Sequence, residues 1–129
     1  MARVALDAGV VIGLLDVRDA HHRAASVAFA AHAADDLRMP ASTYAEVLAL
    51  PAREGRLQEV EEEIAALGIV VDPLEPEAAE RAAVLRGRSR SLLLADVLVV
   101  GYAEAVRAQA VLTTDRRLER ISPLVRVVV

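Results

Sequence analysis

The segment that decides the fold is Val4-Ala5-Leu6-Asp7-Ala8-Gly9-Val10-Val11-Ile12-Gly13-Leu14-Leu15. It begins as a short apolar run typical of a buried strand, and a second apolar segment of helical character follows Asp7. A carboxylate between a buried strand and a buried helix is costly unless another group pairs with it. Ligands of open α/β sheets collect at the carboxyl ends of the parallel strands. The position of Asp7 therefore raises the question of whether other acids reach the same place.

The composition limits the class of protein. A chain of 129 residues suits one domain, and we expect residues 1–129 to form it. Apolar residues make up 55% and aromatic residues only 2%, so the core is built from Ala, Val, Leu and Ile. The absence of cysteine excludes disulfides and thiolate zinc sites, which fits a cytoplasmic protein. Apolar runs broken by Asp7 and Asp96 are too short to span a bilayer, and the N-terminus lacks the features of a signal peptide, so we expect no membrane contact.

Strand-like and helical segments alternate along the chain. Apolar runs predict strands at Arg3–Leu6, Leu37–Met39, Ile69–Val71, Ala110–Thr113 and Val125–Val129. Helical patterns lie between them, at Val10–Leu15, Ala20–Ala34, Ser42–Leu50, Glu59–Leu67, Glu75–Arg86 and Leu92–Ala108. Pro51 is expected at or just beyond the end of its helix, and Gly68 is expected to cap the next one. This alternation predicts an α/β fold with a mainly parallel sheet covered on both faces.

Four acids stand out, and each also has an ordinary structural explanation. Asp7 and Asp115 follow predicted strands and precede helical segments, so either is a plausible helix cap. Glu46 closes the pattern Thr43-Tyr44-Ala45-Glu46, which is the sequence of a capping box. Asp96 is the only charged residue between Arg90 and Glu104 and could start its helix.

A polar stripe is the second structural explanation for Asp96. Arg107 follows it by eleven residues, which places the two within about 20° of each other around a continuous helix. A carboxylate this deep in apolar sequence is nevertheless the least ordinary of the four, and it remains a candidate functional residue.

The joint pattern of the four acids favours a metal site. Asp7 and Asp115 lie just past strand ends, while Glu46 and Asp96 lie in the first turn or so of helices, so a parallel sheet would bring all four to one edge. Two unneutralised carboxylates about 4 Å apart repel by roughly 4 kcal/mol at an effective dielectric constant near 20. A hard divalent cation with oxygen ligands, Mg²⁺ or Mn²⁺, relieves that repulsion and can activate water in phosphoryl transfer.

These motifs, in this order, resemble the PIN domain, and within it the VapC-like toxins of type II toxin–antitoxin systems. They are Leu6-Asp7 with Val11-Ile12-Gly13-Leu14-Leu15, Glu46 on a helix, Ala95-Asp96-Val97-Leu98, and Leu112-Thr113-Thr114-Asp115. The resemblance covers the whole chain and implies a three-layer α/β/α sandwich with a mainly parallel central sheet. It also implies a Mg²⁺-dependent endoribonuclease that cleaves RNA phosphodiester bonds. Asp7 and Asp96 would be the principal metal ligands, Glu46 would complete the set or orient water, and Asp115 would bind metal directly or through water.

The same resemblance implies partners. A small VapB-like antitoxin would block the site, often by inserting an arginine, and a homodimer is expected because dimers are usual in the family. Many relatives carry a hydroxyl residue directly after the first aspartate, where this chain has Ala8 and then Gly9. Thr113 or Thr114 could supply that hydroxyl instead. Arg117 stands where relatives are often polar or acidic.

The charge is unevenly spread along the chain. Residues 1–80 carry 6 Arg and 15 acids, whereas residues 81–129 carry 9 Arg and 4 acids, and there is no lysine. Guanidinium groups suit phosphate because they bind it with two parallel hydrogen bonds. Either this basic half lines the path of an RNA backbone or it is an ordinary solvated surface; the residues concerned are Arg86, Arg88, Arg90, Arg116 and Arg117.

Two other functional classes are alternatives to the ribonuclease. A catalytically silent PIN-like scaffold that acts through protein–protein contacts is the main alternative, and the presence of all four acids argues against it. A receiver or phosphohydrolase domain also places an aspartate after its first strand, but it needs a lysine near the phosphate, and this chain has none. The histidines His21, His22 and His32 are expected on a helix surface rather than at a metal.

Overall fold

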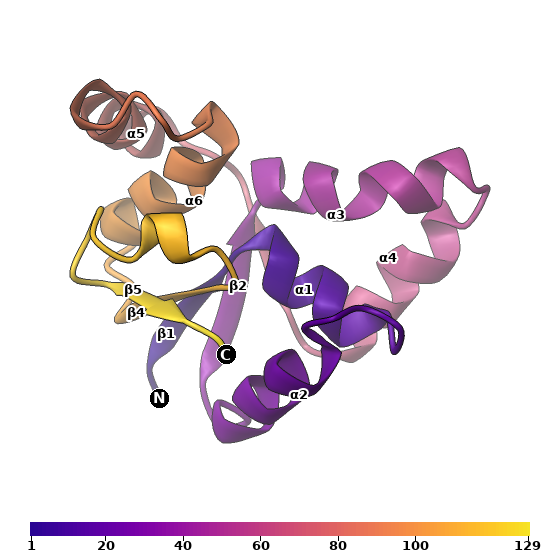
Figure 1. Ribbon diagram of the computed structural model, residues 1–129. Coiled ribbons are helices and arrows are strands. Elements are labelled where there is room, and N and C mark those ends of the chain that lie inside the picture. The colour runs from indigo at the N-terminus through magenta and orange to yellow at the C-terminus, as the bar shows by residue number, and fades with distance from the viewer.

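A five-stranded parallel sheet forms the centre of the computed structural model, which describes all 129 residues (Figure 1). The strands are β1 (Arg3–Leu6), β2 (Asp36–Pro40), β3 (Val70–Asp72), β4 (Ala110–Thr113) and β5 (Val125–Val127). Their order across the sheet is β3-β2-β1-β4-β5, and every neighbouring pair is parallel. The parallel sheet predicted from the alternating pattern is therefore confirmed.

Helices cover both faces of this sheet. One face carries α1 (Ala8–Leu15), α2 (His22–Ala31), α3 (Ala41–Arg53) and α4 (Leu57–Ala66). The other carries α5 (Pro76–Arg88), α6 (Leu94–Ala105) and the short 3₁₀ helix η1 (Arg116–Leu118). In β1, Val4 and Leu6 enter the first core and Ala5 enters the second, as the two-residue period of a strand requires. The result is the expected three-layer α/β/α sandwich.

Close packing of α5 against α6 fixes the helix that carries Asp96. A Cβ atom at Gly101 would lie 2.6 Å from the carbonyl oxygen of Ala78 and 2.7 Å from the amide nitrogen of Ala82. Only glycine at position 101 lets the two helix backbones approach this closely. Residues 89–93 join the two helices and lead directly to the start of α6.

Several helix boundaries differ from those predicted, and two of the differences involve Pro51 and Arg107. The third helix was expected to end at Leu50, with Pro51 at or just beyond its end, but α3 continues to Arg53 and contains Pro51. The sixth helix was expected to reach Ala108, but α6 ends at Ala105. Arg107 adopts a left-handed conformation with φ 58°, and the Ala108 amide donates to the Ala103 carbonyl at 2.8 Å. Arg107 therefore lies outside the helix, and the proposed polar stripe with Asp96 does not form.

None of the helices is both long enough and apolar enough to cross a membrane.

Candidate active site

The switch point of the sheet lies between the central strand β1 and its neighbour β4. After β1 the chain enters α1 on one face, whereas β4 is reached from α6 on the opposite face. Such a point leaves a crevice at the carboxyl ends of the strands. Asp7 directly follows β1, and Asp115 follows β4 after one intervening residue. The two acids thus lie at the carboxyl ends of neighbouring strands.

Thr113, the last residue of β4, links these two acids. Its hydroxyl donates to Asp7 Oδ2 at 2.7 Å and accepts from the Asp115 amide at 3.0 Å, and the side chain is fully buried. Of the two threonines considered from the sequence, Thr113 is the one that bonds to Asp7. Thr114 packs its hydroxyl against Gly9, where any side chain would collide with it.

Asp7 is both a helix cap and a member of a larger network. Its Oδ1 accepts from the Ala8 amide at 2.9 Å, so the capping explanation is correct. Capping leaves Oδ2 for Thr113, and the residue is only 8% exposed. Helix capping therefore explains the contact of Oδ1 but not the contact of Oδ2 with Thr113.

Asp96 and Asp115 meet on either side of one arginine. Asp96 Oδ2 accepts from the Leu93 amide at 3.0 Å and so caps α6, while Asp115 Oδ1 accepts from the Arg117 amide at 2.9 Å and caps η1. Arg117 Nη2 lies 2.7 Å from Asp115 Oδ2 and 3.9 Å from Asp96 Oδ2. Three of the four acids are thus joined through Thr113 and Arg117.

Glu46 does not belong to a capping box, because β2 runs to Pro40 and α3 begins at Ala41, two residues before Thr43. Thr43 is buried inside the helix, and its hydroxyl has no hydrogen-bond partner. Partial burial of the Glu46 carboxyl group raises its pKa, and the negative charges of Asp7 and Asp96 raise it further. Glu46 is exposed and its side chain makes no hydrogen bond or ion pair, so charge alone links it to Asp7 and Asp96.

The pKa values of Asp7 and Asp115 move in opposite directions. Burial raises the pKa of Asp7; hydrogen bonds from Thr113 and Ala8 oppose this change, and the charges of Asp96 and Asp115 add to it. The Arg117 side chain holds the pKa of Asp115 below its usual value. The inner end of the cluster therefore carries negative charge without a counter-charge, whereas the outer end is partly neutralised.

No group of three or more histidine, aspartate or glutamate side chains is arranged so that it could hold a metal ion. Asp96 and Asp115 are turned toward local partners, the Leu93 amide and Arg117. The chemistry of the donors nevertheless fits a hard divalent cation, because all four are carboxylates. A cation would also relieve the repulsion that contributes to the raised pKa values of Asp7 and Glu46.

A model of the PIN domain family matches residues 4–123, which include all four acids. The chain belongs to the PIN domain family. A search of curated proteins found no match.

Solved structures share the fold of this PIN domain at low sequence identity. A toxin–antitoxin complex from Klebsiella pneumoniae matches with a TM-score of 0.80 and 20% identity, covering 98% of both chains. VapBC2 from Rickettsia felis, bound to a DNA fragment of its promoter, matches with a TM-score of 0.74 and 12% identity, covering 95% of this chain and 96% of that one. VapC20 of Mycobacterium tuberculosis, a toxin that cleaves the sarcin–ricin loop, matches with a TM-score of 0.66 and 14% identity, covering 84% of this chain and 86% of that one.

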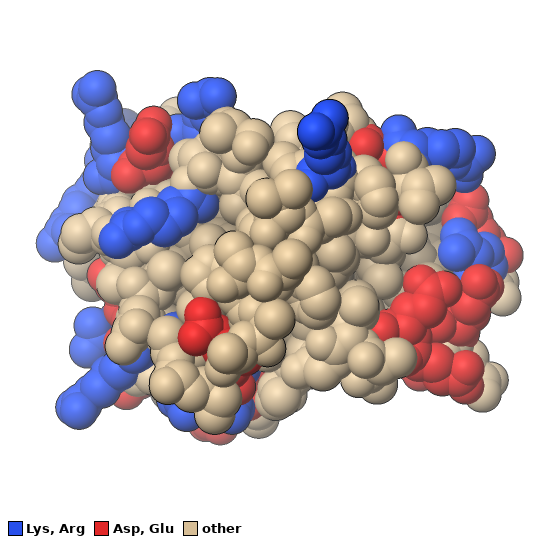
Figure 2. Space-filling view, turned by 90° about the horizontal axis from the view of Figure 1, so that it is seen from below, with Lys and Arg blue, Asp and Glu red and all other residues tan.

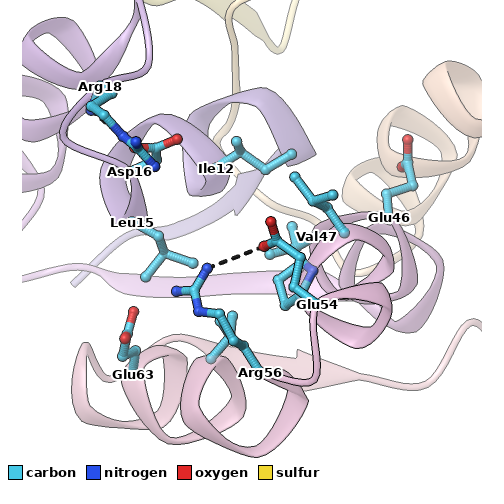
Figure 3. A pocket seen from close by; sticks show the side chains of 12 residues that line it. Ile12, Leu15, Asp16, Arg18, Glu46, Val47, Glu54, Arg56 and Glu63 are labelled. Atoms are coloured by element: carbon cyan, nitrogen blue, oxygen red, sulfur yellow. Dashed lines mark hydrogen bonds and ion pairs between the residues drawn. The ribbon is translucent and has the colours of Figure 1, made fainter.

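A pocket of about 240 Å³ lies beside Glu46 of this PIN domain, between α1, α3 and α4 (Figure 3). Its five hydrophobic lining residues include Ile12, Leu15 and Val47. Charged side chains surround them, and Arg56 pairs with Glu54 at 3.3 Å. Glu46 lies at one end and points away from the centre of the pocket. An elongated apolar ligand in this pocket would therefore end beside a site acid.

Charge is divided between the two ends of the PIN domain. In Figure 2 acidic side chains gather on one side of the end formed by α3 and α4, where α4 carries Glu59, Glu61, Glu62 and Glu63 and Glu54 follows α3. The predicted phosphate-binding arginines lie elsewhere: Arg86 and Arg88 in the last turn of α5, and Arg90 in the segment before α6. Arg88, Arg90 and Arg116 are exposed. The basic surface thus includes the segment that leads to Asp96.

Proposed function

We propose that this PIN domain is a Mg²⁺-dependent endoribonuclease and acts as the toxin of a toxin–antitoxin pair. The observation that carries the proposal is the connected set of acids at the switch point, where Thr113 and Arg117 join Asp7, Asp115 and Asp96. A cluster of mutually repelling carboxylates around the buried Asp7 destabilises the fold and is more typical of a site than of a structural element. The toxins of similar fold support the choice of reaction.

Asp7 and Asp96 would hold the cation, with Glu46 and Asp115 binding directly or through water. When bound, Mg²⁺ or Mn²⁺ supplies activation of water and stabilisation of the charge that develops on the phosphate. The chain itself does the positioning, since Thr113 fixes the Asp7 carboxylate and the Asp115 backbone at once. The raised pKa of Glu46 suits it to orient the attacking water and to accept its proton.

Exposed arginines would carry the RNA backbone to these acids. Arg88 and Arg90 lie within eight residues of Asp96 along the chain, and both side chains are exposed. Neutral glutamine at both positions should weaken RNA binding and flatten its dependence on salt, because each lost phosphate contact lowers the number of released counterions. Unchanged binding would refute this part of the proposal.

The pocket between α1, α3 and α4 would receive the antitoxin. Its apolar lining with the acids Asp16, Glu54 and Glu63 suits an amphipathic helix that carries basic residues. Such a helix would bring a basic side chain toward Glu46, at the end of the pocket. The toxin–antitoxin complexes from Klebsiella pneumoniae and Rickettsia felis support a partner of this class. A homodimer, as is usual in the family, is part of the same proposal.

Replacing Asp96 by asparagine tests the reaction. Asparagine keeps an oxygen that can accept from the Leu93 amide, so α6 should remain capped and the protein folded. Mg²⁺-dependent cleavage of RNA, and growth arrest on expression without antitoxin, should both be lost. Glu104→Gln is the matched control, because it removes one charge from the other end of α6 and should leave both unchanged.

The alternative is a catalytically silent scaffold, and the same assay separates it from the enzyme. A wild-type protein that neither cleaves RNA with Mg²⁺ or Mn²⁺ nor arrests growth would establish the scaffold and refute the nuclease.

A further inference from the structure

Arg117 is the one arginine that pairs with the acids of the site. Its Nε atom lies 3.1 Å from both carboxylate oxygens of Asp115, and Nη2 lies 2.7 Å from Oδ2. Nη2 also lies 3.9 Å from Asp96 Oδ2, so one guanidinium reaches carboxylates from two segments that are far apart in sequence. No other ion pair involves Asp7, Glu46, Asp96 or Asp115.

The Arg117 guanidinium supplies the positive charge that a bound cation would otherwise supply. Both oxygens of Asp115 accept hydrogen bonds from Arg117, and Asp96 Oδ2 accepts from the Leu93 amide. Lone pairs engaged by N–H groups are not free to ligate a metal. In this conformation both oxygens of Asp115 are therefore occupied by Arg117.

The arginine side chain is much more exposed than the acids it contacts. Its side chain is 58% exposed, whereas those of Asp96 and Asp115 are 16% and 24% exposed. Two hydrogen bonds that do not involve the guanidinium also hold Asp115. Its backbone N–H donates to the Thr113 hydroxyl, and its Oδ1 accepts from the Arg117 backbone N–H. The guanidinium can therefore leave while both acids stay in place.

We propose that Arg117 is a built-in competitor for the divalent cation. It neutralises Asp96 and Asp115 when no cation is bound, and it turns outward to solvent when a cation takes its place. This inference rests on the proposed function, since it requires that the acids bind a cation at all.

A purely structural role for Arg117 predicts the opposite result. If the guanidinium serves to orient Asp115, its removal loosens a ligand and weakens cation binding. If it competes, its removal strengthens cation binding. The sign of the change in Mn²⁺ affinity therefore distinguishes the two roles without any measurement of catalysis.

The experiment is calorimetric titration of Mn²⁺ into the wild type, Arg117→Gln and Arg116→Gln. Arg116 is exposed and makes no ion pair, so its replacement removes the same charge one residue away without touching the acids. Arg117→Gln should lower the Kd for Mn²⁺ about fivefold, the upper range expected for loss of an exposed ion pair. Arg116→Gln should change it less than about twofold. Circular dichroism checks that each variant is folded.

Each other outcome overturns a specific statement. An equal gain in both variants would mean that only net charge matters, and a weaker Kd in Arg117→Gln would make the residue structural; either result refutes competition but keeps the cation site. Binding that is absent from all three proteins, or that persists unchanged in Asp7→Asn, would refute the proposed metal site together with the inference.

Discussion

The site around Asp7 and the ion-pair cluster around Arg38 are built from the same residue types. Arg38 donates to Asp36 at 2.9 and 3.0 Å and to Asp72 at 3.0 Å, and Arg3 adds a longer contact to Asp36 at 3.4 Å. Tyr102 donates to Asp72 Oδ2 at 2.6 Å. Two arginines thus face two aspartates, and the Arg38 cluster joins β1, β2, β3 and α6 without net charge.

The Asp7 site has the opposite balance, with four carboxylates and one arginine. The pKa of Asp36 is lowered, because hydrogen bonds from Arg38 and Arg3 outweigh the effect of burial. The pKa of Asp7 is raised, because burial and neighbouring acids outweigh its hydrogen bonds. A fold under selection for stability alone would pair its acids as the Arg38 cluster does. The unbalanced cluster is therefore the part of the molecule for which we propose a binding role.

The variant with the largest expected effect is Asp7→Asn, which removes one charge from the unbalanced site. Asparagine can still accept from the Ala8 amide and donate to the Thr113 hydroxyl, so the local structure should survive. Mg²⁺-dependent cleavage should fall by about 10²–10³-fold or more. Without metal, the variant should melt about 3 °C higher than the wild type at pH 7, since a buried charge is gone. Nuclease assays and thermal melts measure the two effects.

The pH dependence checks the cause of that stabilisation. The folded-state pKa of Asp7 is raised above its usual 3.8, so folding favours the protonated acid. The free energy of unfolding of the wild type should therefore rise as pH falls through the folded-state pKa of Asp7 toward 3.8. The stability difference between the wild type and Asp7→Asn should close over that range. A gap that widens on acidification would show that Asp7 is stabilising as a charged group.

Strand ends were predictable from sequence because single residues mark them. Asp7 ends an apolar run, and the strands predicted at Arg3–Leu6 and Ala110–Thr113 match β1 and β4. A parallel sheet then brings Asp7 and Asp115 to one edge by geometry alone. This part of the site follows from periodicity and needs no knowledge of side-chain packing.

The rest depended on tertiary contacts or on unusual backbone conformations. The pattern from Thr43 to Glu46 has the letters of a capping box, but the helix begins earlier because β2 leads straight into it. Arg107 ends α6 in a left-handed conformation that glycine usually supplies. The contact of Arg117 with Asp96 spans 21 positions along the chain and depends on how η1 packs. No local pattern encodes any of these three features.

A matched pair of arginine variants compares the stability contributions of the two clusters, with smaller expected effects. Arg38→Gln leaves Asp36 and Asp72 facing each other without their shared counter-charge, and should lower the free energy of unfolding by about 2 kcal/mol and Tm by about 8 °C. Arg117→Gln removes the same charge from an exposed pair and should change Tm by less than about 4 °C. Urea unfolding and thermal melts compare them. Equal losses would mean that both arginines are structural.

Tyr102→Phe gives the smallest expected effect and tests whether the Arg38 cluster works as a unit. The phenol is 1% exposed and phenylalanine fills the same space, so only the hydrogen bond to Asp72 is lost, at about 1 kcal/mol. Burial and this hydrogen bond raise the pKa of Tyr102 above its usual 10.0. The unfolded chain therefore releases the phenolic proton before the folded one does, and wild-type stability falls as pH rises above about 10. The advantage over Tyr102→Phe should be complete at pH 8 and shrink at pH 11 in urea titrations. An advantage that stays constant across that range would show that the Tyr102 proton is not tied to folding, and the cluster would then reduce to the two arginine–aspartate pairs.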